Sequence, residues 1–232
     1  MEKVEGNIIA FVNPLQFQTG KESPNIAGHL LNFLIIGENA AQFEANFLQR
    51  QQRLKLIADK IKYIPAAPQI TEKLIVPLRH AHATFLMGNF LGTLALCGTI
   101  GEMLTIFWFE ISQFIINEKQ MDLEDQKSVF GNEFEKLGQD RRINILEYYG
   151  VINKETASNL EKIRKIRNNY LHYWNKDHDS IENDAHQTYC ATIESVLGIF
   201  PQTFEQGRIK LKSDVTQYLA KHGIITTDAE EV

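Results

Sequence analysis

A run of nineteen residues without a charged side chain, Ala83 to Gly101, most constrains how this 232-residue chain can fold. Its length is close to the roughly 20 apolar residues that cross a bilayer, and the central helix of a helical bundle has the same character. The bundle is favoured because the run is rich in glycine and threonine, because Glu102 follows at once, and because the apolar pattern then continues to Glu110. We therefore expect a long buried helix in a soluble bundle and no membrane span.

The rest of the chain favours an all-α fold with an irregular N-terminal arm. Almost no segment alternates apolar and polar residues with period two, whereas the helical period recurs often. We expect helices over the following stretches: 38–64, 70–116, 133–149, 153–172, 180–200 and 210–221. The second stretch would break or kink at Pro77, and Gly88 and Gly92 would lie inside it, where their spacing suits close helix approach. Asn153 or Thr156 would cap the fourth.

Three parts are expected along the chain. Residues 1–65 form an arm and an amphipathic helix that packs on the bundle, residues 66–205 form the helical domain, and residues 206–232 form a C-terminal helix with a disordered acidic tail. The N-terminal apolar run is too short for a secretory signal, which favours a cytoplasmic location. Cys97 and Cys190 lie far apart in apolar contexts, so we expect buried reduced thiols rather than a disulfide.

The net charge gives no general indication of nucleic-acid binding. A formal charge of -5 at pH 7 repels a polyanion on average. Residues 136–167 differ, since they hold eight basic and four acidic side chains. Such a segment is most often a solvated face, so this charge pattern alone predicts no site.

The helix expected over residues 160–172 carries a charge on its apolar face. With Leu160 at zero on a helical wheel, Arg167 falls at about 340°, inside the stripe that should build the bundle. That stripe also contains Ile163, Ile166, Tyr170 and Leu171. Burying a guanidinium without a partner costs several kcal/mol, so Arg167 requires a carboxylate, a polar cluster or a wet groove.

Glu102 is the acidic residue that meets this requirement, since it lies in the apolar run of the central helix. A Glu102–Arg167 ion pair would resolve both placements, and its role could be structural or functional. Arg164, Asn168 and His172 follow at intervals of four and form a polar ridge beside the stripe. His172 lies about 140° round the helix from Arg167, so the two meet one ligand only if the arginine reaches round or the helix ends near His172.

The motif Arg167-Asn168-x-x-x-His172 resembles the signature of the HEPN superfamily, which has an arginine, a polar residue and a histidine near the end of a long helix. The lead-in from Glu147 to Ile166 is also similar to that family, as is the upstream stretch Gly98 to Leu104 with its acidic residue. The resemblance covers roughly residues 80–200. It implies a bundle that dimerises with the motif helices near the two-fold axis, and many members are metal-independent ribonucleases.

The resemblance also implies a role for each site residue. Cleavage of RNA through its own 2′-hydroxyl would use His172 for proton transfer, Arg167 to stabilise charge on the phosphate and Asn168 as a neutral donor. Three residues would support them: Glu102, Arg164 and Tyr170. No metal or other cofactor is required.

We therefore expect an all-α, HEPN-like homodimer that acts on RNA as a metal-independent endoribonuclease at a composite dimer site. It could serve as a toxin or antiviral effector, with an antitoxin-type protein as partner. The alternative is a catalytically inactive HEPN-type dimerisation or nucleotide-binding module in which Glu102 and Arg167 form a structural pair. Tyr170, Tyr173 and Trp174 could stack on bases, although packing in the core or at an interface is favoured.

Histidines elsewhere form weaker metal-site candidates. His178, Glu182 and His186 are spaced by four and would share a helix face, but no fourth ligand is placed, and a solvated helix start is favoured. His80 and His82 form a His-x-His pair that we expect in an exposed polar turn before the central helix. The sequence thus predicts no metal site.

Overall fold

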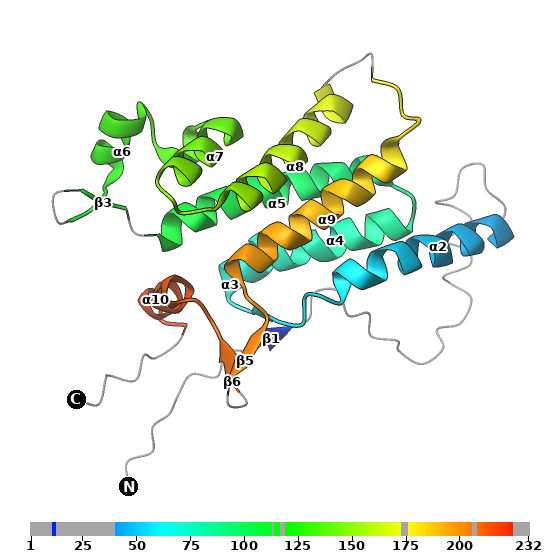
Figure 1. The fold of residues 1–232 in the computed structure, drawn as a ribbon, viewed down its shortest axis with the longest axis horizontal. Helices are drawn as coiled ribbons and strands as arrows, with labels where there is room; N and C mark the ends of the chain where they lie inside the picture. Colours follow the sequence, from blue (N-terminus) through cyan, green and yellow to red (C-terminus); the bar gives the residue numbers. More distant parts are fainter. Residues whose placement is uncertain are drawn as a thin grey trace, which may run out of the picture.

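The computed structural model describes residues 11–12, 40–112, 114–116, 119–172, 176–205 and 208–224. Within these residues helices pack as a bundle, and strands form only two-stranded antiparallel pairs. Figure 1 shows α4, α5, α8 and α9 side by side, with α2 along one side and α10 at one end. The prediction of an all-α helical bundle is confirmed.

The helices follow one another with short connections. In chain order they are α2 (Ala40–Ala58), α3 (Pro68–Ile70), the π-helix η1 (Thr71–Ile75), α4 (Val76–Leu86), α5 (Phe90–Ile111), α6 (Leu123–Phe130), the 3-10 helix η2 (Phe134–Lys136), α7 (Gln139–Tyr148), α8 (Lys154–His172), α9 (Ile181–Ile199) and α10 (Ser213–Lys221). The strand pairs are β1 (Phe11–Val12) with β2 (Ile64–Pro65), β3 (Ile115–Ile116) with β4 (Lys119–Gln120), and β5 (Thr203–Glu205) with β6 (Arg208–Lys210).

Helix α5 is the centre of the bundle, as expected for the uncharged run. It contacts α4, α7, α8, α9 and α10, and its side chains are fully buried at intervals of three and four residues: Leu94, Cys97, Ile100 and Leu104. The leucines and the isoleucine each contribute about 1.5–3 kcal/mol by leaving water. By length and composition alone α5 could also cross a membrane; half of its most apolar window is buried, and the core helix of a soluble protein passes the same test. Both cysteines are free thiols, Cys97 fully buried and Cys190 partly buried.

The uncharged run is divided between two helices, which the sequence prediction missed. Helix α4 ends at Leu86, Gly88 takes a φ of 77°, and α5 begins at Phe90. Placing Gly88 inside a helix was therefore wrong: it lies in the left-handed region that glycine enters without steric cost. The break expected at Pro77 was also wrong, because η1 continues directly into α4 and Pro77 stands in the first turn of α4.

Helix α2 is amphipathic as predicted and contacts α4 and α9. Phe43 and Leu54 are buried on its inner face. Arg50 is only 7% exposed; its Nη1 lies 3.5 Å from the carbonyl of Leu86, and its guanidinium lies 5.2 Å from the ring centre of Phe90. This arginine therefore joins α2 to the corner between α4 and α5. The expected irregular arm and the acidic tail lie almost wholly outside the described residues.

Helix α8 carries the predicted motif. Asn153 caps it, since the Oδ1 atom accepts from the backbone N–H of Thr156 at 2.8 Å. Leu160 and Tyr170 are buried as predicted, but Leu171 is 41% exposed, so its assignment to the buried stripe was wrong. Leu160 and Leu171 fall within about 20° of each other on the wheel. Tyr170, one residue earlier in the same last turn, is buried, so at this end of α8 the bundle covers the side of the helix that holds Tyr170 and leaves the side of Leu171 open.

Candidate functional site

Arg167 reaches from α8 across to α5. Its Nη1 donates to Oε1 of Glu102, which forms the ion pair that the wheel predicted. The side chain of Arg167 is 16% exposed and that of Glu102 is 33% exposed, so the contact lies at the edge of the bundle and not in its centre. Both side chains therefore keep some contact with solvent.

Gly98 leaves the space through which Arg167 passes. A Cβ atom at Gly98 would lie 2.1 Å from Cδ of Arg167, and the three heavy atoms nearest to it all belong to that arginine. Gly101 has a related role, since its Cβ would lie 3.1 Å from Nε2 of Gln139 and 3.3 Å from Cγ2 of Ile163. Because Gly98 and Gly101 have no side chain, Arg167 of α8 and Gln139 of α7 can lie directly against the backbone of α5.

Asn168 holds the guanidinium on its other edge. Its Oδ1 accepts from Nε of Arg167 at 3.1 Å and from Nη2 at 3.0 Å. A guanidinium carries five N–H donors, and these contacts with Glu102 and Asn168 use three. Two N–H groups of a fixed guanidinium therefore remain for a ligand, which is the arrangement that binds phosphate oxygens well.

His172 is exposed at the last residue of α8 and makes no hydrogen bond or ion pair to the described part of the chain. It follows Arg167 by five positions, or about 7.5 Å along the axis and about 140° around it. By helix geometry the two side chains of the motif therefore leave α8 in different directions. Tyr173 and Trp174 lie outside the described residues.

The two other supporting candidates have partners within the bundle. Arg164 makes a bidentate contact with Glu161, with Nε and Nη2 at 2.8 and 2.6 Å from its two carboxylate oxygens. The hydroxyl of Tyr170 donates to Asp184 at 2.6 Å and lies 3.0 Å from the hydroxyl of Ser180. Burial raises the pKa of Tyr170, and the bond to Asp184 adds to that rise. Tyr170 thus fixes the end of α8 to the start of α9.

The sequence analysis missed two buried polar residues near the Glu102–Arg167 ion pair. Gln139 and Arg142 on α7 are 6% and 5% exposed, and neither amide atom of Gln139 nor Nε of Arg142 has a hydrogen-bond partner in the described structure. A wheel places both within about 60° of each other, on the same face as Ile143 and Leu146. That position on an apolar face was the signal, and it matches the one that identified Arg167.

Arg142 shares the electrostatic environment of the ion pair. Burial lowers its pKa, Glu102 and Glu135 act in the opposite direction, and the charge of Arg167 lowers it further. Glu102 therefore lies within range of two arginines, one bonded to it and one with an unpaired Nε. We call Glu102, Gln139, Arg142, Arg167 and Asn168 the polar layer between α5, α7 and α8. Unsatisfied buried groups cost about 1–3 kcal/mol each, and in native proteins they often mark a binding or catalytic role.

The weaker metal candidates have other partners. Glu182 pairs with Arg53 at 2.7 Å, and Nε2 of His186 lies 3.4 Å from the carbonyl of Arg53. The exposed turn expected for His82 was wrong. His82 is buried in α4, with Nδ1 2.9 Å from the hydroxyl of Tyr189. Burial lowers the pKa of His82 to about 4. The described residues contain no group of three or more His, Cys, Asp or Glu side chains placed to hold a metal ion.

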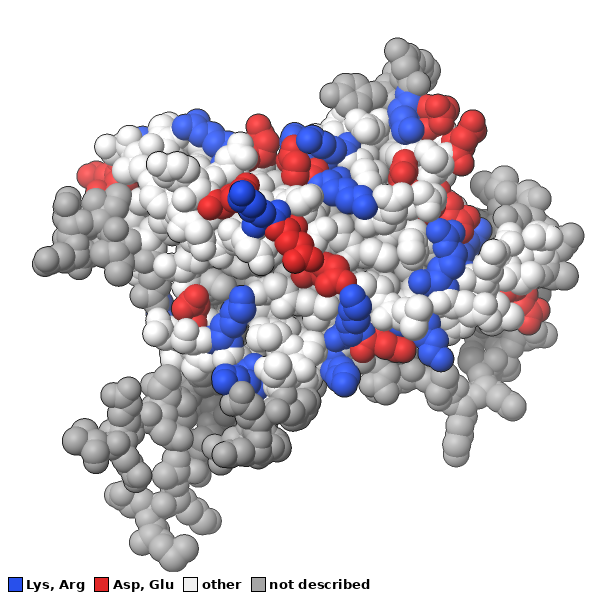
Figure 2. Space-filling view, in the orientation of Figure 1, with Lys and Arg blue, Asp and Glu red and all other residues white. Residues whose placement is uncertain are grey.

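Basic and acidic side chains alternate over the face of the molecule in Figure 2, which shows no extended basic patch. Ion pairs explain part of this: Lys127 and Lys136 both contact Glu133, and Lys165 contacts Glu161. Comparison with protein-family models, with curated proteins and with solved structures finds no match to this chain.

Proposed function

We propose that this protein is a metal-independent endoribonuclease of the HEPN type that works as a homodimer. One observation carries the proposal: the guanidinium of Arg167 is fixed by Glu102 and Asn168, yet keeps two N–H donors, and the exposed imidazole of His172 follows on the same helix. A fixed cation for phosphate and an accessible proton carrier are what cleavage through the 2′-hydroxyl needs.

In this mechanism an imidazole removes the proton from the 2′-hydroxyl, and the 2′-oxygen attacks the adjacent phosphorus. The bond from phosphorus to the 5′-oxygen breaks, and an imidazolium gives that oxygen a proton. Arg167 stabilises the charge that gathers on the non-bridging oxygens. The products are a 2′,3′-cyclic phosphate and a 5′-hydroxyl, and no electrons are exchanged with a cofactor.

A composite site follows from the geometry of α8. Because Arg167 and His172 of one chain diverge around the helix, the guanidinium of one protomer would act with the imidazole of its partner near a two-fold axis. The exposed Leu171 beside His172 would then supply apolar contact between the protomers.

Arg142 gives the polar layer a second function in this scheme. A phosphate that binds Arg167 competes with the carboxylate of Glu102, which then needs another cation. Arg142 is buried, lies within electrostatic range of Glu102 and has an unpaired Nε. It would neutralise Glu102 while Arg167 holds the phosphate, so Arg142→Met should lower the cleavage rate without unfolding the protein.

The test is cleavage of a mixed RNA pool by purified protein in EDTA. Arg167→Ala and His172→Ala should each reduce the rate by about 100-fold or more. Arg79→Ala and His80→Ala are matched controls, because both residues are exposed on α4, outside the polar layer, and should cleave like wild type. Absence of cleavage of every RNA tested, or cleavage by the Arg167 and His172 variants at the wild-type rate, would refute the proposal.

Mixing the two inactive variants tests the composite site. Random exchange of Arg167→Ala and His172→Ala protomers gives hybrid dimers in half of the population, each with one intact composite site. The mixture should recover about a quarter of wild-type activity. Recovery of none would place both groups in one chain instead.

The second candidate is a catalytically silent dimerisation or nucleotide-binding module. It is favoured by the fact that three of the five N–H groups of Arg167 already have partners and by the mixed charge of the surface in Figure 2. For such a module Arg167→Ala would lower stability or nucleotide affinity, and the wild-type protein would leave RNA intact.

A further inference from the structure

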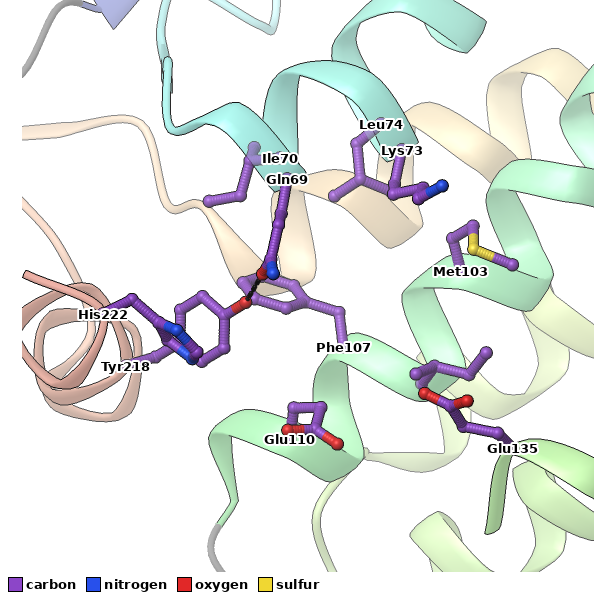
Figure 3. Close-up of a pocket in the computed structure, with 11 residues that line it drawn as sticks. Gln69, Ile70, Lys73, Leu74, Met103, Phe107, Glu110, Glu135, Tyr218 and His222 are labelled. Carbon is purple, nitrogen blue, oxygen red and sulfur yellow. Dashed lines mark hydrogen bonds between the residues drawn. The ribbon is translucent and has the colours of Figure 1, made fainter. Parts of the chain in front are cut away.

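A cavity of about 480 Å³ lies between α5, α10, η2 and the segment formed by α3 and η1. Its volume falls in the range of small-molecule sites. Part of one wall is η1, and short π-helices occur frequently at functional sites. Figure 3 shows side chains from all these elements around one space.

The cavity has an apolar and aromatic wall. Ile70, Leu74 and Phe107 are nearly fully buried and line it together with Met103. The ring of Tyr218 meets that of Phe107 edge to face, with centroids 5.1 Å apart. The hydroxyl of Tyr218 donates to Gln69, which fixes α10 against α3 and keeps this wall in place (Figure 3).

Two carboxylates line the cavity without an ion-pair partner in the described structure, and the cation that acts on Glu135 is the buried Arg142 of the polar layer. Glu110 on α5 and Glu135 on η2 lie on the side opposite Ile70 and Leu74 in Figure 3, and neither forms an ion pair within the described residues. Glu110 acts on the cavity wall, because its charge adds to the burial that raises the pKa of Tyr218.

The one lysine of the lining does not balance these charges. The Nζ atom of Lys73 lies 2.8 Å from Oε1 of Glu72, on its own helix, so its charge is already matched outside the cavity. His222 lies over the ring of Tyr218, with centroids 4.4 Å apart. The cavity is thus acidic at one side and aromatic at the other, which excludes anions and suits a cation.

We propose that this cavity is a binding site for a small organic cation, a protonated amine carried on an aromatic or aliphatic body. The body would contact Phe107, Leu74 and Met103, while the ammonium would lie between Glu110 and Glu135, within reach of the aromatic faces. The proposal does not rest on the ribonuclease function: none of these residues belongs to the polar layer, and the connection between the two sites is the charge of Glu135, which also acts on Arg142.

Calorimetric titration of the full chain with tryptamine tests the proposal. We expect saturable binding with a Kd on the order of 1 mM or tighter, given the size of the ligand. Raising NaCl from about 0.02 to 0.5 M should weaken it, because the charges are partly solvated. Indole-3-propionate, with the same ring and a carboxylate, should not bind.

Variants then locate the site. Glu110→Gln and Glu135→Gln should each weaken tryptamine binding by about two- to fivefold, as expected for one solvent-accessible charge contact. Glu44→Gln makes the same change of charge on α2, away from the cavity, and should bind like wild type. Glu72→Gln should also weaken binding, because it frees the charge of Lys73. All the carboxylates are exposed, so the variants should fold.

Three results would overturn the proposal. They are no binding of tryptamine at about 10 mM, binding of the anionic analogue as tightly as the amine, or unchanged affinity in both Glu110→Gln and Glu135→Gln. Weakening in either variant, with Glu44→Gln unaffected, supports it. RNA cleavage is not read in this experiment, so its outcome is separate from that of the ribonuclease test.

Discussion

Replacing Gly98 with alanine should displace Arg167 without removing any charged group. The new Cβ would lie 2.1 Å from Cδ of the arginine, whereas carbon atoms in contact lie about 3.5–4.0 Å apart. The middle of the side chain must therefore move by about 1.5 Å, and the guanidinium loses its alignment with Glu102 and Asn168. Overpacking of this kind costs about 1–3 kcal/mol, and alanine recovers up to about 1 kcal/mol over glycine inside a helix. We expect a net loss of about 1–2 kcal/mol.

A double-mutant cycle shows whether Arg167 is the cause. In the Arg167→Ala background the space beside Gly98 is free, so Gly98→Ala should become neutral or stabilise the protein by up to about 1 kcal/mol. Urea unfolding followed by circular dichroism gives the four free energies, and Thr99→Ala, at the exposed neighbouring position, should change them by no more than about 0.5 kcal/mol. The same cost for Gly98→Ala with and without the arginine would falsify the assignment of this space to Arg167.

Other predictions concern stability. Tyr170→Phe removes the hydroxyl that bonds α9 and should cost about 1–2 kcal/mol in urea unfolding, whereas Tyr148→Phe, at an 86% exposed site, should cost nothing measurable. Below pH 6.5 His82 is protonated in the unfolded chain but not in the folded chain, where its pKa is about 4. The free energy of unfolding should therefore fall by on the order of 3 kcal/mol as the pH falls from 6.5 to about 4. His82→Gln should make the free energy of unfolding less dependent on pH in this range. Gly88→Ala places a side chain at a φ of 77°, and its new Cβ atom would lie 2.8 Å from Nη1 of Arg50. This should lower the free energy of unfolding by about 1–3 kcal/mol, seen as a lower Tm. An unchanged Tm would contradict the close packing of this corner.

Much of the fold could be predicted because it depends on local patterns. The helical period, the cap at Asn153 and the uncharged run that crosses from α4 into α5 are properties of neighbouring residues, and they predicted the fold class and most helices. The Glu102–Arg167 pair was predictable for a related reason: two charges on apolar faces each need a partner, and the chain offered one for each.

What could not be predicted depends on contacts between distant segments. Nothing near His82 indicates that Tyr189 on α9 will receive its imidazole, so an exposed turn was the natural expectation. The corner at Gly88 could have been predicted, because Gly88 suits the end of one helix and Asn89 caps the next. It was missed because the run without charged residues was interpreted as one continuous helix. For Gln139 and Arg142, polar residues at the start of a helix resemble a solvated turn until the face they share with Leu146 is examined.

The π-helix η1 accommodates one extra residue without changing the rotational register of the chain segment before it. A π-turn contains one residue more than the α-helical turn it replaces, and each of its residues turns the helix by correspondingly less than the roughly 100° of an α-helix. Deleting a single residue within Thr71–Ile75 should therefore restore regular α-helix and leave Pro68–Ile70 in nearly the same orientation relative to α4. Gln69 would still reach Tyr218, and α10 should keep its hydrogen bond to the bundle. The same deletion within α4, which has no extra residue to lose, would turn everything before it by about 100°.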